Sequence, residues 1–184
     1  MNRNLFYGDL IKLSAPRAED SQIMARWYED DEYLRNVDTD IALPKSVNQL
    51  EAEESNDAGN IEFRLRSIKN DELIGFVAIH SIEWNNRTGL LAIGIGEAKN
   101  RHKGYGTDAL KVILRYAFHE LNLHRVGLDV IEYNTGAIHA YEKAGFVHEG
   151  RLRAAVCRDG KYFDRLMMGI LRSEWASYVQ KIDG

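Results

Sequence analysis

The chain has 184 residues and a mass of 21.0 kDa, with 45% hydrophobic and 28% charged residues. This size and composition predict a single domain over residues 1–184 with a sizeable core. The formal net charge of −4 argues against a general attraction to nucleic acid or to an anionic membrane. No segment reaches the roughly 18 apolar residues of a membrane span, and the N-terminus lacks the apolar core of a signal peptide. Cys157 is the single cysteine, which excludes an internal disulfide, fits a reducing cytoplasmic setting, and is expected to be buried or passive.

The first third of the chain predicts two strands and two helices. A short strand is expected over residues 10–13, and apolar residues at helical spacing predict a helix over 18–28. The acidic cluster that follows, residues 29–32, is interpreted as a solvated helix end. A second helix is expected over residues 45–55, and alternation predicts a half-buried strand over 61–66.

The middle of the chain predicts a three-stranded meander followed by a crossover. Residues 73–79 and 90–95 are apolar runs that continue the meander, and a helix is expected over 108–121. The next strand, residues 125–131, alternates, so that Val126, Leu128 and Val130 share one face and Asp129 points to the other.

The last third predicts one helix and a hairpin. Asn134 is a good N-cap for a helix that runs through Ala144, and Gly145 suits its left-handed end. Strands are expected over residues 150–157 and 162–171, joined by the hairpin signal Asp159-Gly160. The whole chain therefore predicts an α/β fold with a mixed sheet of about seven strands and about four helices.

A basic glycine loop between strand 90–95 and the helix after it is the clearest functional signal. It reads Arg-His-Lys-Gly-Tyr-Gly-Thr at residues 101–107. Glycines let backbone N–H groups surround an oxygen-rich ligand, and the start of a helix adds unpaired N–H groups and a positive dipole end. We interpret the loop as a pyrophosphate site.

Two nucleotide-binding alternatives fit this loop less well. Residues 104–109 match the dinucleotide pattern G-x-G-x-x-A, and Asp129 supplies an acid on the next strand. However, residues 97–103 separate the strand from the first glycine, and the chain lacks repeated βαβ units. The loop also lacks the Gly-Lys-Ser/Thr ending of an NTPase P-loop.

The second half of the chain contains, in order, a strand, an Arg-x-x-Gly-x-Gly loop, a long helix, a strand, Asn134, and then Ala-Tyr-Glu-Lys-Ala-Gly-Phe at residues 140–146. This order of elements and motifs resembles the GNAT family of N-acetyltransferases. Residues 149–153 and 159–161, with Asp164, resemble the branch that holds ribosomal-protein-alanine and polyamine acetyltransferases. The resemblance covers residues 73–175 well and 10–66 loosely. It implies a mostly antiparallel sheet, acetyl-CoA as acetyl donor, and allows a homodimer.

The resemblance also implies roles for individual residues. The loop amides would hold the pyrophosphate, and the strand before the loop would splay from its neighbour to admit the pantetheine arm. Tyr141 would be the general acid toward the departing thiolate, the alternative being a core aromatic residue; Asn134 would contact the cofactor arm or only cap its helix. No metal is expected. The cofactor-binding residues implied are Gly94, Ile95, Gly96, Arg101, His102, Lys103, Gly104, Tyr105, Gly106, Thr107, Asn134 and Lys143.

The reaction implied is direct attack of a primary amine on the thioester of acetyl-CoA. The amine is a polyamine, another small amine or a protein N-terminus, and the acidic cluster would favour a polyamine. Asp129, Glu97 and Glu83 are candidates for the base, with water as the alternative. A non-catalytic acyl-CoA-binding module on the same fold is the competing function.

Overall fold

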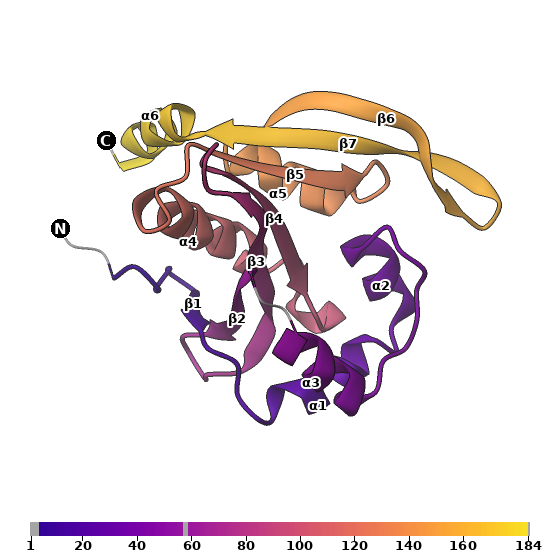
Figure 1. The fold of residues 1–184 in the computed structure, drawn as a ribbon. Coiled ribbons are helices and arrows are strands. Elements are labelled where there is room, and N and C mark those ends of the chain that lie inside the picture. Colours follow the sequence, from indigo (N-terminus) through magenta and orange to yellow (C-terminus); the bar gives the residue numbers. More distant parts are fainter. Residues whose placement is uncertain (1–3, 57–58, 184) are drawn as a thin grey trace.

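A computed structural model, which describes residues 4–56 and 59–183, arranges seven strands in one sheet. The strands are β1 (Ile11–Ser14), β2 (Ile61–Ser67), β3 (Leu73–Glu83), β4 (Thr88–Ile95), β5 (Arg125–Ile131), β6 (Val147–Arg158) and β7 (Lys161–Leu171). Their order across the sheet is β1-β2-β3-β4-β5-β7-β6 (Figure 1). Only β4 and β5 pair in parallel, so the predicted mixed, mostly antiparallel sheet is confirmed.

The described residues form six α-helices, two more than expected. They are α1 (Asp20–Trp27), α2 (Asp31–Val37), α3 (Val47–Asn56), α4 (Tyr105–His119), α5 (Thr135–Lys143) and α6 (Arg172–Asp183). The helix expected to begin near residue 108 begins three residues earlier. None of the helices in the described part of the chain is long and apolar enough to cross a membrane.

The helix α2 corrects the interpretation of the acidic cluster. Residues 31 and 32 are the first turn of a helix, not a solvated helix end. Asp30 is the N-cap, and its carboxylate accepts a hydrogen bond from the Tyr33 N–H at 3.2 Å. Carboxylates in a first turn also interact favourably with the positive end of the helix dipole. The helix is only seven residues long, which leaves little periodicity to recognise in the sequence.

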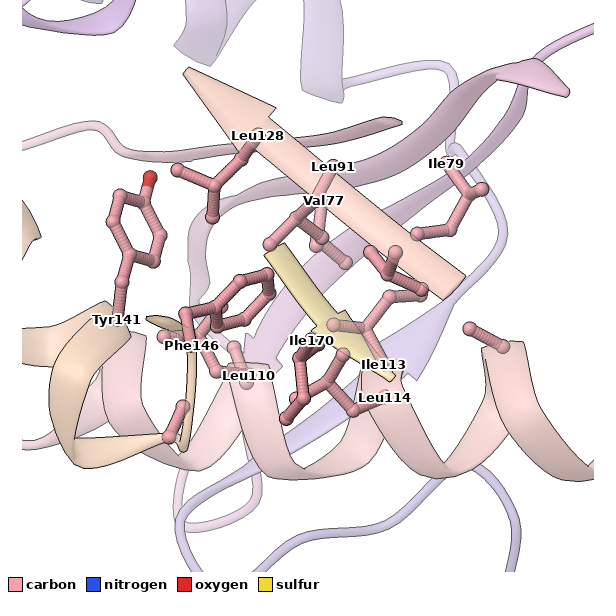
Figure 2. Close-up of a cluster of buried hydrophobic side chains, with 14 of the residues drawn as sticks. Val77, Ile79, Leu91, Leu110, Ile113, Leu114, Leu128, Tyr141, Phe146 and Ile170 are labelled. Atoms are coloured by element: carbon pink, nitrogen blue, oxygen red, sulfur yellow. The ribbon is translucent and has the colours of Figure 1, made fainter. Parts of the chain in front are cut away.

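The main hydrophobic core lies between the sheet and α4, with α5 beside it. Figure 2 shows Leu110, Ile113 and Leu114 of α4 facing side chains from the sheet, among them Val77 and Leu128. A second, smaller cluster joins α1, α2 and α3 to the start of β3. Its buried residues are Met24, Trp27, Tyr33, Leu34, Leu50 and Leu73.

Local signals read from the sequence are confirmed at the ends of α5 and in the last hairpin. Gly145 has φ +99°, as a left-handed helix end requires, and the Phe146 ring packs 5.8 Å from the Tyr141 ring. Asp159 and Gly160 both have positive φ, at +52° and +72°, which is the type I′ geometry favoured in two-residue hairpins.

The β6–β7 hairpin reaches beyond the rest of the sheet toward α2 (Figure 1). Arg35 of α2 forms a two-pronged ion pair with Asp159 at the hairpin tip, with N–O distances of 2.7 and 3.0 Å. Arg158 donates hydrogen bonds to the carbonyl oxygens of Asp38 and Asp40. Cys157, near the tip, is exposed, so the expectation that it is buried is wrong.

Candidate active site

The strands β4 and β5 separate after a short paired segment. Their register covers Thr88 with Arg125, Gly89 with Val126, and Leu90 with Gly127. Beyond these pairs β4 turns away from β5 (Figure 1) while staying bonded to β3, as β5 does to β7. Backbone groups on the two facing edges are therefore left for an extended ligand that carries amide groups of its own.

The basic glycine loop lies at the end of β4 and leads directly into α4. Gly104 is the N-cap residue of this helix and has φ +84°, a conformation that favours glycine. No side chain caps the helix, and within residues 4–56 and 59–183 no acceptor bonds the N–H groups of Tyr105, Gly106 and Thr107. A Cβ built on Gly106 would have its nearest neighbour, Ile95 Cγ1, at 3.9 Å, so space remains beside the helix start. These features make an anion site.

Arg101 belongs to this loop, but its side chain faces α2. Its Nη2 donates to the Asp30 carboxylate at 3.0 Å and to the Gly96 carbonyl at 3.1 Å, and Glu32 lies 3.5 Å from Nη1. The guanidinium thus links the loop to α2 instead of pointing at the start of α4. It also offsets part of the charge of the acidic cluster that was expected to attract a polyamine.

Gly94 and Gly96 are required by the packing of aromatic rings. A Cβ on Gly96 would lie 2.0 Å from a ring atom of Trp27 in α1. A Cβ on Gly94 would lie 2.6 Å from Phe76 and 3.0 Å from the hydroxyl of Tyr33 in α2. Both glycines therefore let helices of the N-terminal half approach β4, a role that the sequence did not reveal.

Asn134 and the start of α5 lie against the glycine loop. A Cβ on Gly136 would be 3.6 Å from the His102 ring, which places the two segments side by side. Asn134 Oδ1 accepts from the Ala137 N–H at 3.2 Å, which confirms the cap, and its Nδ2 donates to the Asn36 carbonyl at 3.1 Å. Contact between Asn134 and a cofactor stays a prediction, as does that of Lys143, which is exposed in the last turn of α5.

Tyr141 is buried, with 8% of its surface exposed, and its hydroxyl points away from α5 (Figure 2). Burial, and to a smaller extent the charge of nearby Asp129, raises the pKa of the Tyr141 hydroxyl well above its ordinary value. The hydroxyl therefore stays protonated at neutral pH. Among the described residues no hydrogen-bond partner faces it, so it is a proton donor left for a ligand.

The three carboxylates considered as bases are placed differently. Asp129 Oδ2 lies 2.5 Å from Arg165 Nε, and this hydrogen bond raises the pKa of the Arg165 guanidinium. Glu97 is paired with Lys99 at 2.9 Å. Glu83 faces Thr88 at the opposite end of β4, about 23 Å from Ile95 at 3.3 Å per residue. The structure does not bring Glu83 to the glycine loop.

An open cleft of about 430 Å³ lies between α2 and the tip of the β6–β7 hairpin. Tyr133 forms part of its wall, donates its hydroxyl proton to the Arg35 carbonyl, and packs edge-on to Phe163 at 5.0 Å. Asp159-Gly160 predicts the hairpin turn, but no local pattern indicates that the hairpin tip meets a helix more than a hundred residues earlier. The charged residues that line the cleft are Asp31, Glu32, Arg35, Arg158, Asp159 and Lys161.

Asp108 is a structural residue of the site that sequence reasoning placed only at a helix start. It is 5% exposed, and its carboxylate accepts hydrogen bonds from the N–H groups of Asp9, Leu10 and Ile11 at 2.8–3.1 Å. A Cβ on Gly8 would overlap this carboxylate at 2.3 Å. Asp108 therefore fixes the first turn of α4 against the beginning of β1.

Sheet order, open strand pair and uncapped helix start together define an acetyltransferase fold of the GNAT type. The model of the acetyltransferase (GNAT) domain matches residues 11–147, and the chain belongs to this family of N-acetyltransferases. It is similar to an uncharacterized N-acetyltransferase derived from the SPbeta prophage of Bacillus subtilis, with 30% identity over 91% of this chain and 93% of the relative.

Two further comparisons concern proteins named for polyamine acetylation. The spermidine N(1)-acetyltransferase of Vibrio cholerae is 36% identical over 56% of this chain and 59% of its own length. A crystal structure of spermidine N-acetyltransferase from Vibrio cholerae, in complex with CoA and spermine, superposes with a TM-score of 0.81 at 27% identity. That superposition covers 90% of this chain and 98% of the other. The CoA in that structure is consistent with acetyl-CoA as the acetyl donor.

Proposed function

We propose that this chain transfers the acetyl group of acetyl-CoA to a small primary amine. The pantetheine arm lies in the opening between β4 and β5, and the pyrophosphate lies at the start of α4. The amine enters through the cleft between α2 and the hairpin tip. The observation that carries the proposal is a parallel strand pair that opens next to a helix start whose N–H groups have no acceptor among the described residues.

The proposed chemistry is a direct transfer. The amine nitrogen attacks the carbonyl carbon of the thioester, the C–N bond forms, and the C–S bond breaks. The sulfur leaves as a thiolate and takes a proton from the Tyr141 hydroxyl. The raised pKa of Tyr141 means that its hydroxyl carries a proton at neutral pH, so a proton is present when negative charge develops on sulfur.

The amine has to lose a proton before or during the attack. An alkylamine with an ordinary pKa near 10 is mostly protonated at pH 7. Asp129 and Glu97 each have a cationic partner within 3 Å, which makes them less available as proton acceptors. We therefore favour water as the group that removes the proton, with Asp129 as the carboxylate that could act after its ion pair opens.

The size of the cleft supports a small acceptor. Pockets for small molecules are typically about 300–1,000 Å³ in volume, and the cleft measures about 430 Å³. The names of the polyamine-acetylating relatives support an amine acceptor of this size.

Thiol release from acetyl-CoA tests the proposal. The purified protein is supplied with acetyl-CoA and, separately, with polyamines, amino acids and peptides that start with alanine. We expect thiol release that depends on an amine and produces an acetylated amine of equal amount by mass spectrometry. A non-catalytic acyl-CoA-binding module would bind acetyl-CoA in calorimetry and release no thiol with any amine.

A further inference from the structure

We infer that the acceptor amine also carries an anionic group, a carboxylate or a phosphate, which Lys161 and Arg158 bind at the hairpin tip. The inference rests on the proposed function and names the class of amine that enters the cleft. It comes from the charges that line the cleft once those already paired within the protein are set aside. A polyamine, which is cationic along its length, does not match what remains.

Two of the three carboxylates that line the cleft already form ion pairs with arginines of the protein. Asp159 holds Arg35 through both of its oxygens, at 2.7 and 3.0 Å, and this contact lowers the pKa of the Asp159 carboxyl. Glu32 lies 3.5 Å from the Arg101 guanidinium. Asp31 is exposed on α2 and has no ion pair among residues 4–56 and 59–183. It is the one carboxylate of the cleft left to attract an ammonium group.

The two cations of the opposite wall form no ion pair among the described residues, and Asp159, whose carboxyl pKa their charges help to lower, is already bound to Arg35 through both oxygens. Arg158 is oriented by the carbonyl oxygens of Asp38 and Asp40, at 3.2 and 3.1 Å, which hold its guanidinium without cancelling its charge. Lys161 is exposed and forms no ion pair in the described part of the chain. Both residues flank the turn of the hairpin, so two positive charges face the cleft from one side.

The uncommitted charges therefore stand on two walls, with Asp31 on α2 and Arg158 and Lys161 on the hairpin. A ligand with an ammonium group and an anionic group complements both walls. A polyamine gains attraction from Asp31 but meets Arg158 and Lys161, whose charges Asp159 offsets only in part because it is bound to Arg35. Exposed charges of opposite sign on facing walls change selectivity between ligands more than they change the stability of the fold.

Matched acceptor pairs test the inference. Alanine is compared with alaninamide, and phosphoethanolamine with ethanolamine, so that carboxylate and phosphate are tested separately; spermidine is the polycationic arm. We expect the anionic member of at least one pair to have the highest kcat/KM of the five amines. In Lys161→Gln we expect the KM of that amine to rise about two- to fivefold and the KM of its neutral partner to stay unchanged, as for loss of one exposed charge contact.

Each variant is compared with the wild type for the same amine and pH, so that differences in amine pKa cancel. Lys111→Gln, an exposed lysine on α4, is the matched control and should leave both values of KM unchanged. Melting curves verify that the variants fold. Spermidine as the best acceptor, or equal effects of Lys161→Gln on the anionic and neutral amines, would overturn the inference and leave the proposed acetyl transfer standing. No thiol release with any of the five amines would overturn both.

Discussion

The two halves of the candidate site present different kinds of chemical groups, backbone groups in one and charged side chains in the other. The cofactor half consists of β4, the glycine loop, α4, β5 and α5, and its binding groups are backbone N–H and C=O groups left open by a splayed strand pair and an uncapped helix. The acceptor half consists of α2 and the β6–β7 hairpin, and its surface is made of charged side chains. Under the proposed function, backbone groups bind a common cofactor whatever the surrounding side chains are, whereas the side chains of the cleft choose the amine.

The largest effect is expected for Tyr141, which the proposed mechanism makes the proton donor toward the departing sulfur. In Tyr141→Phe the ring keeps its packing against Phe146, and the lost hydroxyl has no hydrogen-bond partner in the described chain. General acid catalysis typically contributes about 10²–10⁴-fold, so kcat should fall by that factor. The affinity for acetyl-CoA should change far less, because the hydroxyl acts mainly when charge develops on sulfur.

Steady-state kinetics, calorimetry and a melting curve on the same variant check this prediction. The melting temperature should be nearly unchanged, since the ring keeps its packing and the hydroxyl has no hydrogen-bond partner among the described residues. Near-normal kcat at saturating acetyl-CoA, under conditions where chemistry limits the rate, would remove Tyr141 from the reaction and make it a core residue.

An intermediate effect is expected at the helix start. Gly106→Val adds a side chain to the space beside α4, where the nearest atom is 3.9 Å away from a Cβ, so the fold can accept it while the anion site fills. The Kd for acetyl-CoA should rise about tenfold or more, a loss of at least about 1.4 kcal/mol of binding free energy. Calorimetry measures it, with Gly150→Val on β6 as the control, because a Cβ there also has 4.0 Å of clearance. Equal affinities in both variants would place the pyrophosphate elsewhere.

The smallest effect is expected where the two halves meet, at Arg101. Its guanidinium bonds Asp30, the N-cap of α2, so Arg101→Met should disturb the acceptor wall more than the cofactor site. We expect KM for the amine to rise about two- to fivefold and the Kd of acetyl-CoA to change less, in line with a partly exposed ion pair.

Asp30→Asn keeps a good N-cap and removes only the charge, so it should give a similar change in KM. The double variant should be no worse than either single variant, because both remove the same contact. A large loss of acetyl-CoA affinity with an unchanged amine KM would instead assign the Arg101 guanidinium to the cofactor.

Several local features of both halves could be predicted because each depends on neighbours in the chain. The Asn134 cap, the left-handed Gly145 and the Asp159-Gly160 turn follow from the conformations that single residues favour, and all three were found. The strand and helix pattern of residues 61–143 follows from hydrophobic periodicity, although ends shift by a few residues. The anion site follows from glycines placed at a helix start.

The meeting of α2 with the hairpin tip, and the contacts that hold the glycine loop and α4 in place, were decided by tertiary structure alone. Three sets of contacts join residues that lie 71 to 124 positions apart. They are Arg101 with Asp30, Arg35 with Asp159, and Asp108 with the N–H groups at the beginning of β1. Gly94 and Gly96 look like weak strand residues in the sequence, and only the rings of α1 and α2 show why no side chain fits there. Local conformational preference carries no information about such contacts, because they form only when the sheet order brings distant segments together.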